Sequence, residues 1–246
     1  MTTERFSSSP PADRRLPARW PVAREQGTRY LLPIGALLAL WGYVGPWINH
    51  PVAGLVIPGL DLGEYVKFLP ATRAGTLTLW RPGFYLPLFA VSLVLSLHIF
   101  RRSLGYTWAW RVPLIGLAGV AALNMLPPAW TPALLRTPEF RVQSLAIAVA
   151  LGVLLTSPLW ALLPRRITGL VTTALILAAL WFPLFGFFQM LDDIGHLYGH
   201  PQRPAWGMWL MLSGCLLLLT IGVSAVMQTE PNPDQAPSSV TPAQEE

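Results

Sequence analysis

Residues 167–191 read "ITGLVTTALILAALWFPLFGFFQML" and contain no Asp, Glu, Lys or Arg. An α-helix rises about 1.5 Å per residue, so roughly 20 apolar residues are enough to cross the hydrocarbon core of a bilayer. The stretch therefore predicts a helix that crosses a membrane.

Five other windows of the chain are also free of charged residues. Only 12% of the 246 residues are charged, about half the share of a typical soluble domain, and the mean hydropathy is +0.47. Soluble cores rarely repeat such runs six times, and the sequence has no alternating ten-residue segments of the kind that build a membrane barrel. It predicts an all-α, polytopic membrane protein with a bundle of about six transmembrane helices. The expected spans are approximately 30–48, 83–100, 112–128, 142–163, 167–188 and 206–227.

Both ends of the chain differ from this apolar middle. Residues 1–29 are rich in Arg, Pro and Ser, and residues 229–246 contain several prolines and no apolar periodicity. Segments of this composition bury too little apolar surface to fold. We expect a disordered basic cytoplasmic tail over 1–29, a six-helix transmembrane domain over 30–228 and a disordered Pro-rich cytoplasmic tail over 229–246.

The basic residues indicate the orientation, because connections rich in Lys and Arg remain on the cytoplasmic side. The first tail, the second connection and the fourth connection together hold eleven of the seventeen basic residues. These are Arg5, Arg14, Arg15, Arg19, Arg24, Arg29, Arg101, Arg102, Arg111, Arg165 and Arg166. We therefore expect an integral protein of a prokaryotic cytoplasmic membrane with both termini in the cytoplasm. The lipid bilayer is its expected partner. The net charge of +5 sits at membrane edges and is not a nucleic-acid signature.

Tryptophan placement agrees with this map. Aromatic side chains with a polar edge gather where the membrane meets water. The tryptophans at expected span ends are Trp47, Trp80, Trp130 and Trp206 outside, and Trp108, Trp110 and Trp160 inside. Trp41 falls in the middle of the first span, so we expect it to pack inside the bundle.

The first outer connection, residues 49–82, is long and apolar. Within it, "DLGEYVKFLP" (61–70) predicts a short interfacial helix, with Asp61 and Glu64 spaced as a capping box. Two interpretations of this helix remain open. It lies on the lipid interface and only covers helix ends, or it serves as a lid over the bundle or a docking surface for a partner.

A polar stretch, "QMLDDIGHLYGHP" (189–201), separates the last two spans. Gly195 and Gly199 disfavour a continuous helix, and His200 precedes a proline, which favours an extended backbone. We expect a water-exposed turn on the outer side.

The same stretch also holds the candidate metal ligands. Asp192, His196 and His200 are spaced four residues apart, so a continuous helix would place them in one stripe with Asp193 beside it. Imidazole and carboxylate groups bind Zn²⁺ and other divalent ions, and His50 in the first outer loop could complete the set. The alternative is a solvated polar turn without metal, and no other cofactor is indicated.

The spans hold no acidic or basic residue at mid-depth, which argues against a proton-coupled pump. Asn124 is the polar residue that we expect to be most buried. The sequence has no HExxH metalloprotease motif, no Walker A loop and no dinucleotide glycine fingerprint.

The leading hypothesis is a non-enzymatic accessory or scaffold subunit that associates with other membrane subunits. The first alternative is a membrane enzyme or metal-handling protein that uses the outer Asp and His residues. The second is a facilitator for a small neutral solute, with a pathway near Asn124.

Overall fold

The computed structural model describes residues 20–127 and 130–227, and within them the fold is all-α with one two-stranded β-ribbon. Residues 1–19 of the first predicted tail and all of the second predicted tail lie outside the described residues. The helices are α1 (Trp20–Val44), α2 (Leu62–Tyr65), α3 (Pro70–Arg73), α4 (Leu86–His98), α5 (Trp108–Leu123), α6 (Arg141–Leu155), α7 (Ser157–Trp160), α8 (Arg165–Tyr198) and α9 (Trp206–Met227). The strands are β1 (Pro46–Ile48) and β2 (Ile57–Pro58), which pair antiparallel.

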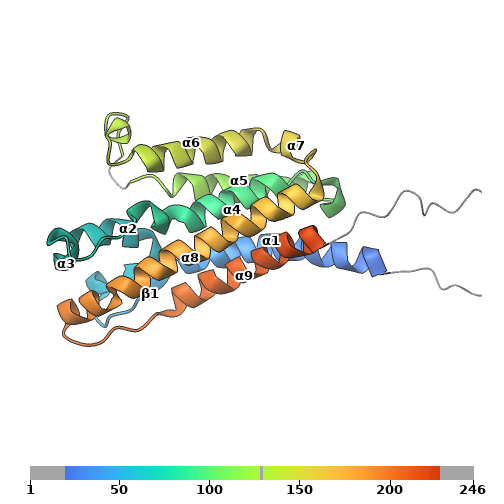
Figure 1. Cartoon of the computed structure of the whole chain (residues 1–246). Coiled ribbons are helices and arrows are strands. Elements are labelled where there is room, and N and C mark those ends of the chain that lie inside the picture. The colour runs from blue at the N-terminus through green and yellow to red at the C-terminus, as the bar shows by residue number, and fades with distance from the viewer. Residues whose placement is uncertain (1–19, 128–129, 228–246) are drawn as a thin grey trace, which may run out of the picture.

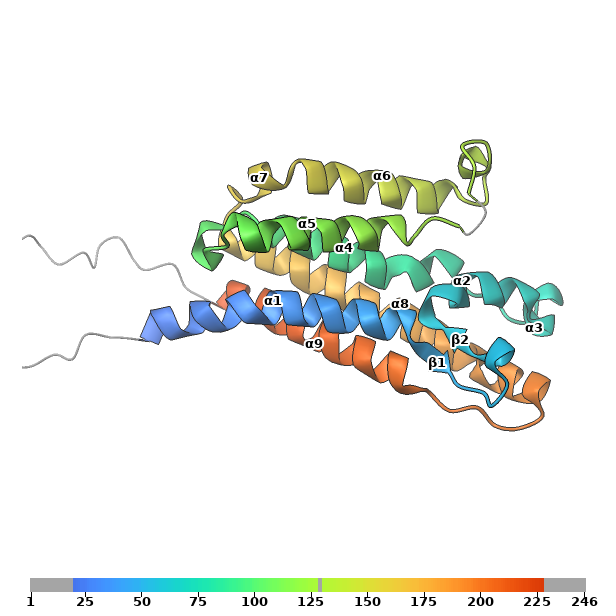
Figure 2. The ribbon, with the colours of Figure 1, turned by 180° about the vertical axis from the view of Figure 1, so that it is seen from behind.

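Each expected span coincides with a helix over most of its described length, and α4 is the central helix. Eleven of its thirteen residues are buried, because α1, α5, α6 and α8 all pack against it. Helix α9 packs between α1 and α8 on the side away from α6 (Figures 1 and 2). Short connections predict neighbouring antiparallel helices, and this holds for α4 and α5. It does not hold for α6 and α8, since α6 packs mainly on α4 and α5 while α8 packs mainly on α4 and α9.

Among the residues that the structure describes, two helices, α8 and α9, are long and apolar enough to cross a membrane, by length and composition. Helices α4, α5 and α6 have 13, 16 and 15 residues, fewer than the roughly 20 that a straight span needs. Short turns extend two of them, since η4 (Arg81–Tyr85) leads into α4 and α7 follows α6 after a break at Thr156. Helix length therefore does not confirm the six-span prediction.

Glycines allow α1 and α9 to lie in close contact. Gly35, Ala39 and Gly42 share one face of α1, and Gly207 and Gly214 face them from α9. A methyl group on Gly42 would lie 2.6 Å from the Gly207 carbonyl oxygen, and one on Gly214 would lie 2.6 Å from the Gly35 carbonyl oxygen. Small residues bring helices together in this way in membrane bundles.

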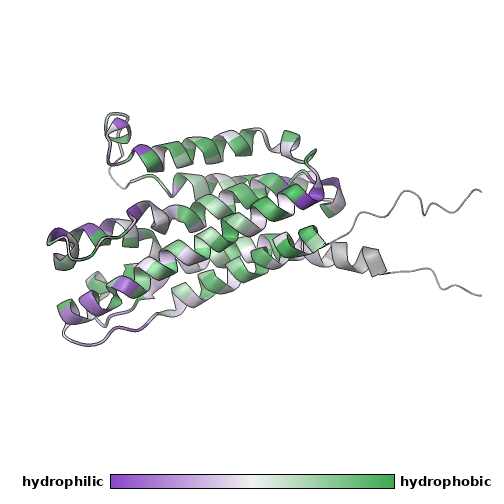
Figure 3. Cartoon of the chain, in the orientation of Figure 1, coloured by the Kyte–Doolittle hydropathy of each residue, from purple (hydrophilic) through white to green (hydrophobic). Residues whose placement is uncertain are grey.

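The bundle has two distinct ends. The arginine end holds the starts of α1, α5 and α8 and the ends of α4, α7 and α9, so both described termini lie there (Figure 1). The cap end holds residues 45–85, 124–127, 130–140 and 196–205, with β1, β2, α2 and α3. Figure 3 shows polar residues gathered at both ends and apolar residues along the helices between them.

Three sequence expectations need correction. Helix α1 begins at Trp20, so residues 20–29 are helical and do not belong to a disordered tail. Trp47 is fully buried between Tyr43 and Phe187, with ring centroids 6.2 and 5.3 Å away, and so does not belong to an interfacial belt. Trp41 is 70% exposed, because it points away from the α1–α9 contact. The sequence shows that an aromatic residue is present but not which face of its helix will be covered.

Candidate functional site

The cap end is built on the β-ribbon that follows α1. Gly59 begins the turn after β2 and lies against Trp47, where an added methyl group would be 2.5 Å from the indole nitrogen. The backbone N–H of Ala205 donates to the Trp47 carbonyl oxygen at 2.8 Å, which ties the last connection to the first. The first and last cap segments are therefore held together through one buried tryptophan.

Four charged side chains form a closed ring across the cap. Lys67 lies 2.7 Å from Glu64 and 2.5 Å from Glu139, and Arg81 lies 2.8 Å from Glu64 and 2.9 Å from Glu139. Both cations also lie 5.1 Å from the centroid of the Phe140 ring. The ring has no net charge and joins the first outer connection to the second.

This ring changes the role that the sequence suggested for Glu64. Asp61 precedes α2 but makes no side-chain cap bond, so the expected capping box does not form. Glu64 turns toward Arg81 instead and also accepts a hydrogen bond from Tyr85 at 3.2 Å. The predicted short helix is present as α2 and the turn after it, and its buried face holds Leu62, Val66 and Leu69.

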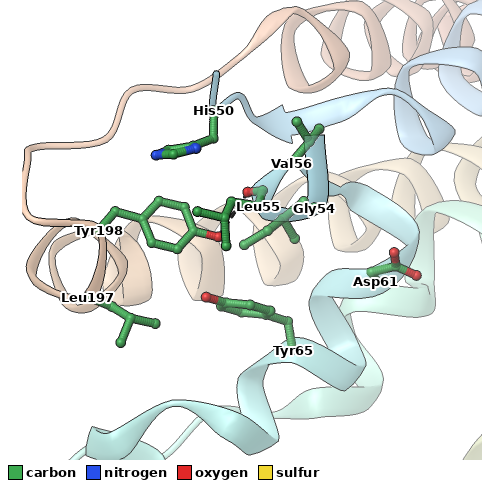
Figure 4. Close-up of a pocket in the computed structure, with 9 residues that line it drawn as sticks. His50, Gly54, Leu55, Val56, Asp61, Tyr65, Leu197 and Tyr198 are labelled. Atoms are coloured by element: carbon green, nitrogen blue, oxygen red, sulfur yellow. Dashed lines mark hydrogen bonds between the residues drawn. The ribbon is translucent and has the colours of Figure 1, made fainter. Parts of the chain in front are cut away.

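A cavity of about 530 Å³ opens beneath the first outer loop. Its walls come from three segments: the loop after β1, the turn that begins α2, and the end of α8. The lining residues are His50, Gly54, Leu55, Val56, Ile57, Asp61, Tyr65, Leu197 and Tyr198. Figure 4 shows the Tyr65 and Tyr198 hydroxyl groups pointing toward each other, with His50 beside Tyr198.

Hydrogen bonds hold the aromatic wall of this cavity in place. The Tyr198 hydroxyl donates to the Leu55 carbonyl oxygen at 2.9 Å. The backbone N–H of Val52 donates to His50 Nδ1 at 3.1 Å, and the His50 ring meets the Tyr198 ring edge-on at 5.1 Å. Burial raises the pKa of Asp61, and the negative charge of Glu64 raises it further. The lining contains no Lys or Arg, so Asp61 is the only acidic or basic side chain apart from His50.

The structure corrects the expectation of a turn over 189–201. Helix α8 continues to Tyr198, because Met190 and Ile194 are fully buried and their packing outweighs the helix-breaking tendency of Gly195. The turn begins only at Gly199, whose φ of 75° requires a glycine-like backbone.

Because the helix continues, Asp192 and His196 lie one turn apart on α8, while His200 lies past the turn. All three border a second hollow of about 350 Å³, and Asp193 does not. The His200 ring stacks on the His50 ring with centroids 5.6 Å apart and planes 13° from parallel. The expected approach of His50 to the last connection is therefore present. Gln202 hydrogen-bonds to His200 Nδ1 at 3.0 Å, and His50 Nδ1 is also occupied.

Over residues 20–127 and 130–227, no group of three or more His, Cys, Asp or Glu side chains lies close enough to hold a metal ion. Of the five expected ligands, His50 and His200 have rings that stack on each other. The metal site at Asp192, Asp193, His196, His200 and His50 stays a prediction.

Asn124 occupies a different place from the one expected. It lies at the end of α5, is only partly buried, and donates its amide N–H to the Val120 carbonyl oxygen at 2.8 Å. It borders an apolar hollow of about 520 Å³ on the outside of the bundle, with Trp41 and Trp206. The more buried polar side chains are elsewhere. They include Ser92, Ser96, Gln143 and Thr172.

Comparison of this chain with protein-family models, curated proteins and solved structures finds no match. The function must therefore be argued from the cap and the bundle themselves.

Proposed function

We propose that this chain crosses a membrane six times and works as a non-enzymatic subunit of a membrane assembly, with the cap end as its binding surface outside the membrane. In this arrangement α1, α4, α5, α6 with α7, α8 and α9 are the spans, and the arginine end faces the cytoplasm. The observation that carries the proposal is an ordered polar cap with an open cavity, placed at one end of a bundle whose sides are apolar.

The outward faces of the outer helices support the membrane part of the proposal. Large apolar side chains are exposed along α1, α5, α6, α8 and α9, a pattern that water disfavours and lipid accepts. Examples are Leu37, Trp41, Val120, Leu145, Leu155, Trp181, Phe185 and Leu216. The central helix α4 is shorter than a straight span. It is tolerated in the bundle because the surrounding helices bury it on all sides.

A labelling experiment separates six spans from two. In a Cys215→Ala background, which removes the single cysteine, one cysteine is placed at Thr78, Ser103, Ala133 or Leu162. Six spans predict that a membrane-impermeant maleimide added to intact cells labels Thr78→Cys and Ala133→Cys only. If only α8 and α9 cross, all four positions lie on one side and label alike, and the proposal fails.

The cap supports the binding part of the proposal. Its ring of ion pairs fixes two loops in one shape, and preorganised surfaces lose less entropy when they bind. The chain should therefore copurify with a reproducible partner or ligand in mild detergent, and Arg81→Ala should reduce this recovery while Arg136→Ala should not. A chain that purifies alone under every condition, with a labelling pattern that still fits six spans, would overturn the binding role only.

The contact between His50 and His200 favours one second candidate, a metal-handling protein. The two rings stack with centroids 5.6 Å apart, and imidazole nitrogens bind Zn²⁺ and other divalent ions. Elemental analysis of the purified wild type and of a His50→Ala/His200→Ala variant tests it. Metal in the wild type alone would support this candidate, and equal metal content in both would remove it.

A further inference from the structure

The cap cavity has a chemical character that narrows what it can bind. We propose that the cavity lined by Asp61, Tyr65 and Tyr198 is a binding site for a small organic ammonium ion. This inference rests on the proposed binding role of the cap and names the class of ligand.

The first argument is charge. The Asp61 carboxylate borders the cavity, and among the described residues no hydrogen bond, ion pair or cation partner accompanies it. Nearby Lys67 and Arg81 are both engaged by Glu64 and Glu139 in the ring described above. An anion would meet repulsion at this wall, whereas a cation would find an unpaired carboxylate.

The raised pKa of Asp61 supports the same reading. Burial and the neighbouring charge of Glu64 both disfavour the ionised carboxylate, and no basic residue offsets them. A bound cation would relieve this unfavourable state, so binding and ionisation of Asp61 would favour each other.

The second argument is the aromatic wall. Asp61 and Tyr65 are four residues apart across the start of α2, and both border the cavity. Figure 4 shows the Tyr65 ring turned toward Tyr198, with Asp61 farther from the two tyrosines. Tyr198 and His50 add two further rings from α8 and the first outer loop. Aromatic faces attract organic cations, and tyrosine rings are among the commonest groups that bind quaternary ammonium ions.

The third argument is size and the remaining surface. A volume of about 530 Å³ is within the range of small-molecule sites, roughly 300–1,000 Å³. Leu55, Val56 and Leu197 supply apolar contact for the carbon part of a ligand, while Asp61 receives its charge. An ammonium ion that carries carbon groups matches this combination, whereas a bare metal ion would use neither the rings nor the leucines.

Choline and its neutral isostere 3,3-dimethyl-1-butanol test the inference, because the two have the same shape and differ in charge. Protein-free detergent micelles serve as the blank for both compounds, because the hydrocarbon part of the neutral alcohol can enter a micelle. Saturation-transfer NMR on the purified full chain should give saturable binding of choline and none of the neutral compound. Asp61→Asn should weaken choline binding by about fivefold or more, the value of one partly exposed charge pair. Asp61→Glu should retain most of the binding.

The matched control is Asp193→Asn, which removes a carboxylate near the end of α8 that does not border the cavity. It should bind choline as the wild type does, and thermal unfolding should show that all variants are folded. Equal binding of choline and the neutral isostere, no binding of either, or unchanged choline binding in Asp61→Asn would overturn the inference. If the chain still labels as a six-span protein and keeps a cap-dependent partner, only the ligand class is wrong, and the proposed function stands.

Discussion

The two ends of the bundle handle charge in opposite ways. At the cap end, Glu64, Lys67, Arg81 and Glu139 neutralise one another in a ring whose members are 18–49% exposed. At the arginine end, Arg101 is only 9% exposed, and its guanidinium donates to the Leu163 carbonyl oxygen at 2.9 Å and to the Thr168 hydroxyl.

No carboxylate contacts Arg101 within the part of the chain that the structure describes. Exposed ion pairs are individually weak, while a buried charged group with neutral partners is costly to disturb. The cap ring therefore consists of weak contacts, whereas the Arg101 contacts at the arginine end are strong. We expect that the cap loops can open without loss of the bundle, and that loss of the Arg101 contacts destabilises the bundle itself.

We expect the largest effect on folding from the close contact between α1 and α9, because these two helices connect both ends of the bundle. Gly214→Leu places a large side chain against the α1 backbone, so we expect loss of folded, monodisperse protein in size-exclusion chromatography. Gly152→Leu is the matched control, because α6 offers open space at that position. Folded Gly214→Leu protein would show that the contact is not essential.

At the arginine end, Arg101→Ala leaves the Leu163 carbonyl and the Thr168 hydroxyl without their donor. We expect destabilisation of roughly 2–3 kcal/mol, the usual value for hydrogen bonds to a charged group. Thermal unfolding in detergent measures it. Arg102→Ala, which removes an exposed neighbour, should change stability very little. Equal effects of the two substitutions would contradict the comparison of the ends.

At the cap, Arg81→Ala removes two of the four contacts in the ring. Because these groups are partly exposed, we expect a global effect of roughly 1 kcal/mol or less. The larger change should be local, as faster hydrogen exchange over residues 61–69 and 134–140. Arg136→Ala should leave both segments protected, since Arg136 is exposed and outside the ring.

The smallest expected effect is the response to pH. The hydrogen bond from Lys67, with that from Arg81, lowers the pKa of Glu139 below its ordinary value of 4.5. A lowered folded-state pKa means that the stabilising contribution is fully present above pH 4.5 and is lost as the pH falls through the lower value. Hydrogen exchange at residues 134–140 should rise in acid, while the Arg101 contacts should persist because guanidinium stays charged. Protection that is independent of pH would show that Glu139 does not hold the cap.

The sequence predicts the helices of this protein better than the contacts between them. Charge-free windows located all six apolar helices, because the need to bury long apolar runs is a local property. The ring at the cap joins Glu64 to Arg81 and Glu139, 17 and 75 positions further along the chain, and no local pattern connects such residues. The end of α8 was misplaced because buried Met190 and Ile194 favour the helix through tertiary packing.

The residues around the cap cavity also come from distant parts of the chain, so the sequence predicted only part of their arrangement. The sequence placed His50 and His200 in the outer loops and suggested that His50 could approach the last connection, and the structure brings their rings into contact. The cavity itself was missed. Asp61 looked like a helix cap and Tyr198 like part of a turn, and only the folded chain places them around one space.

The glycine contact between α1 and α9 has a consequence for how this protein is made. It joins the first helix to the last, with about 160 residues of chain between Gly42 and Gly207. During synthesis the small-residue face of α1 has no partner until the ribosome has delivered α9. Until then that face lacks the neighbour that it has in the folded chain, so the α1–α9 contact can form only after nearly all of the chain has been made. A chain that ends before α9 would leave the small-residue face of α1 without this partner.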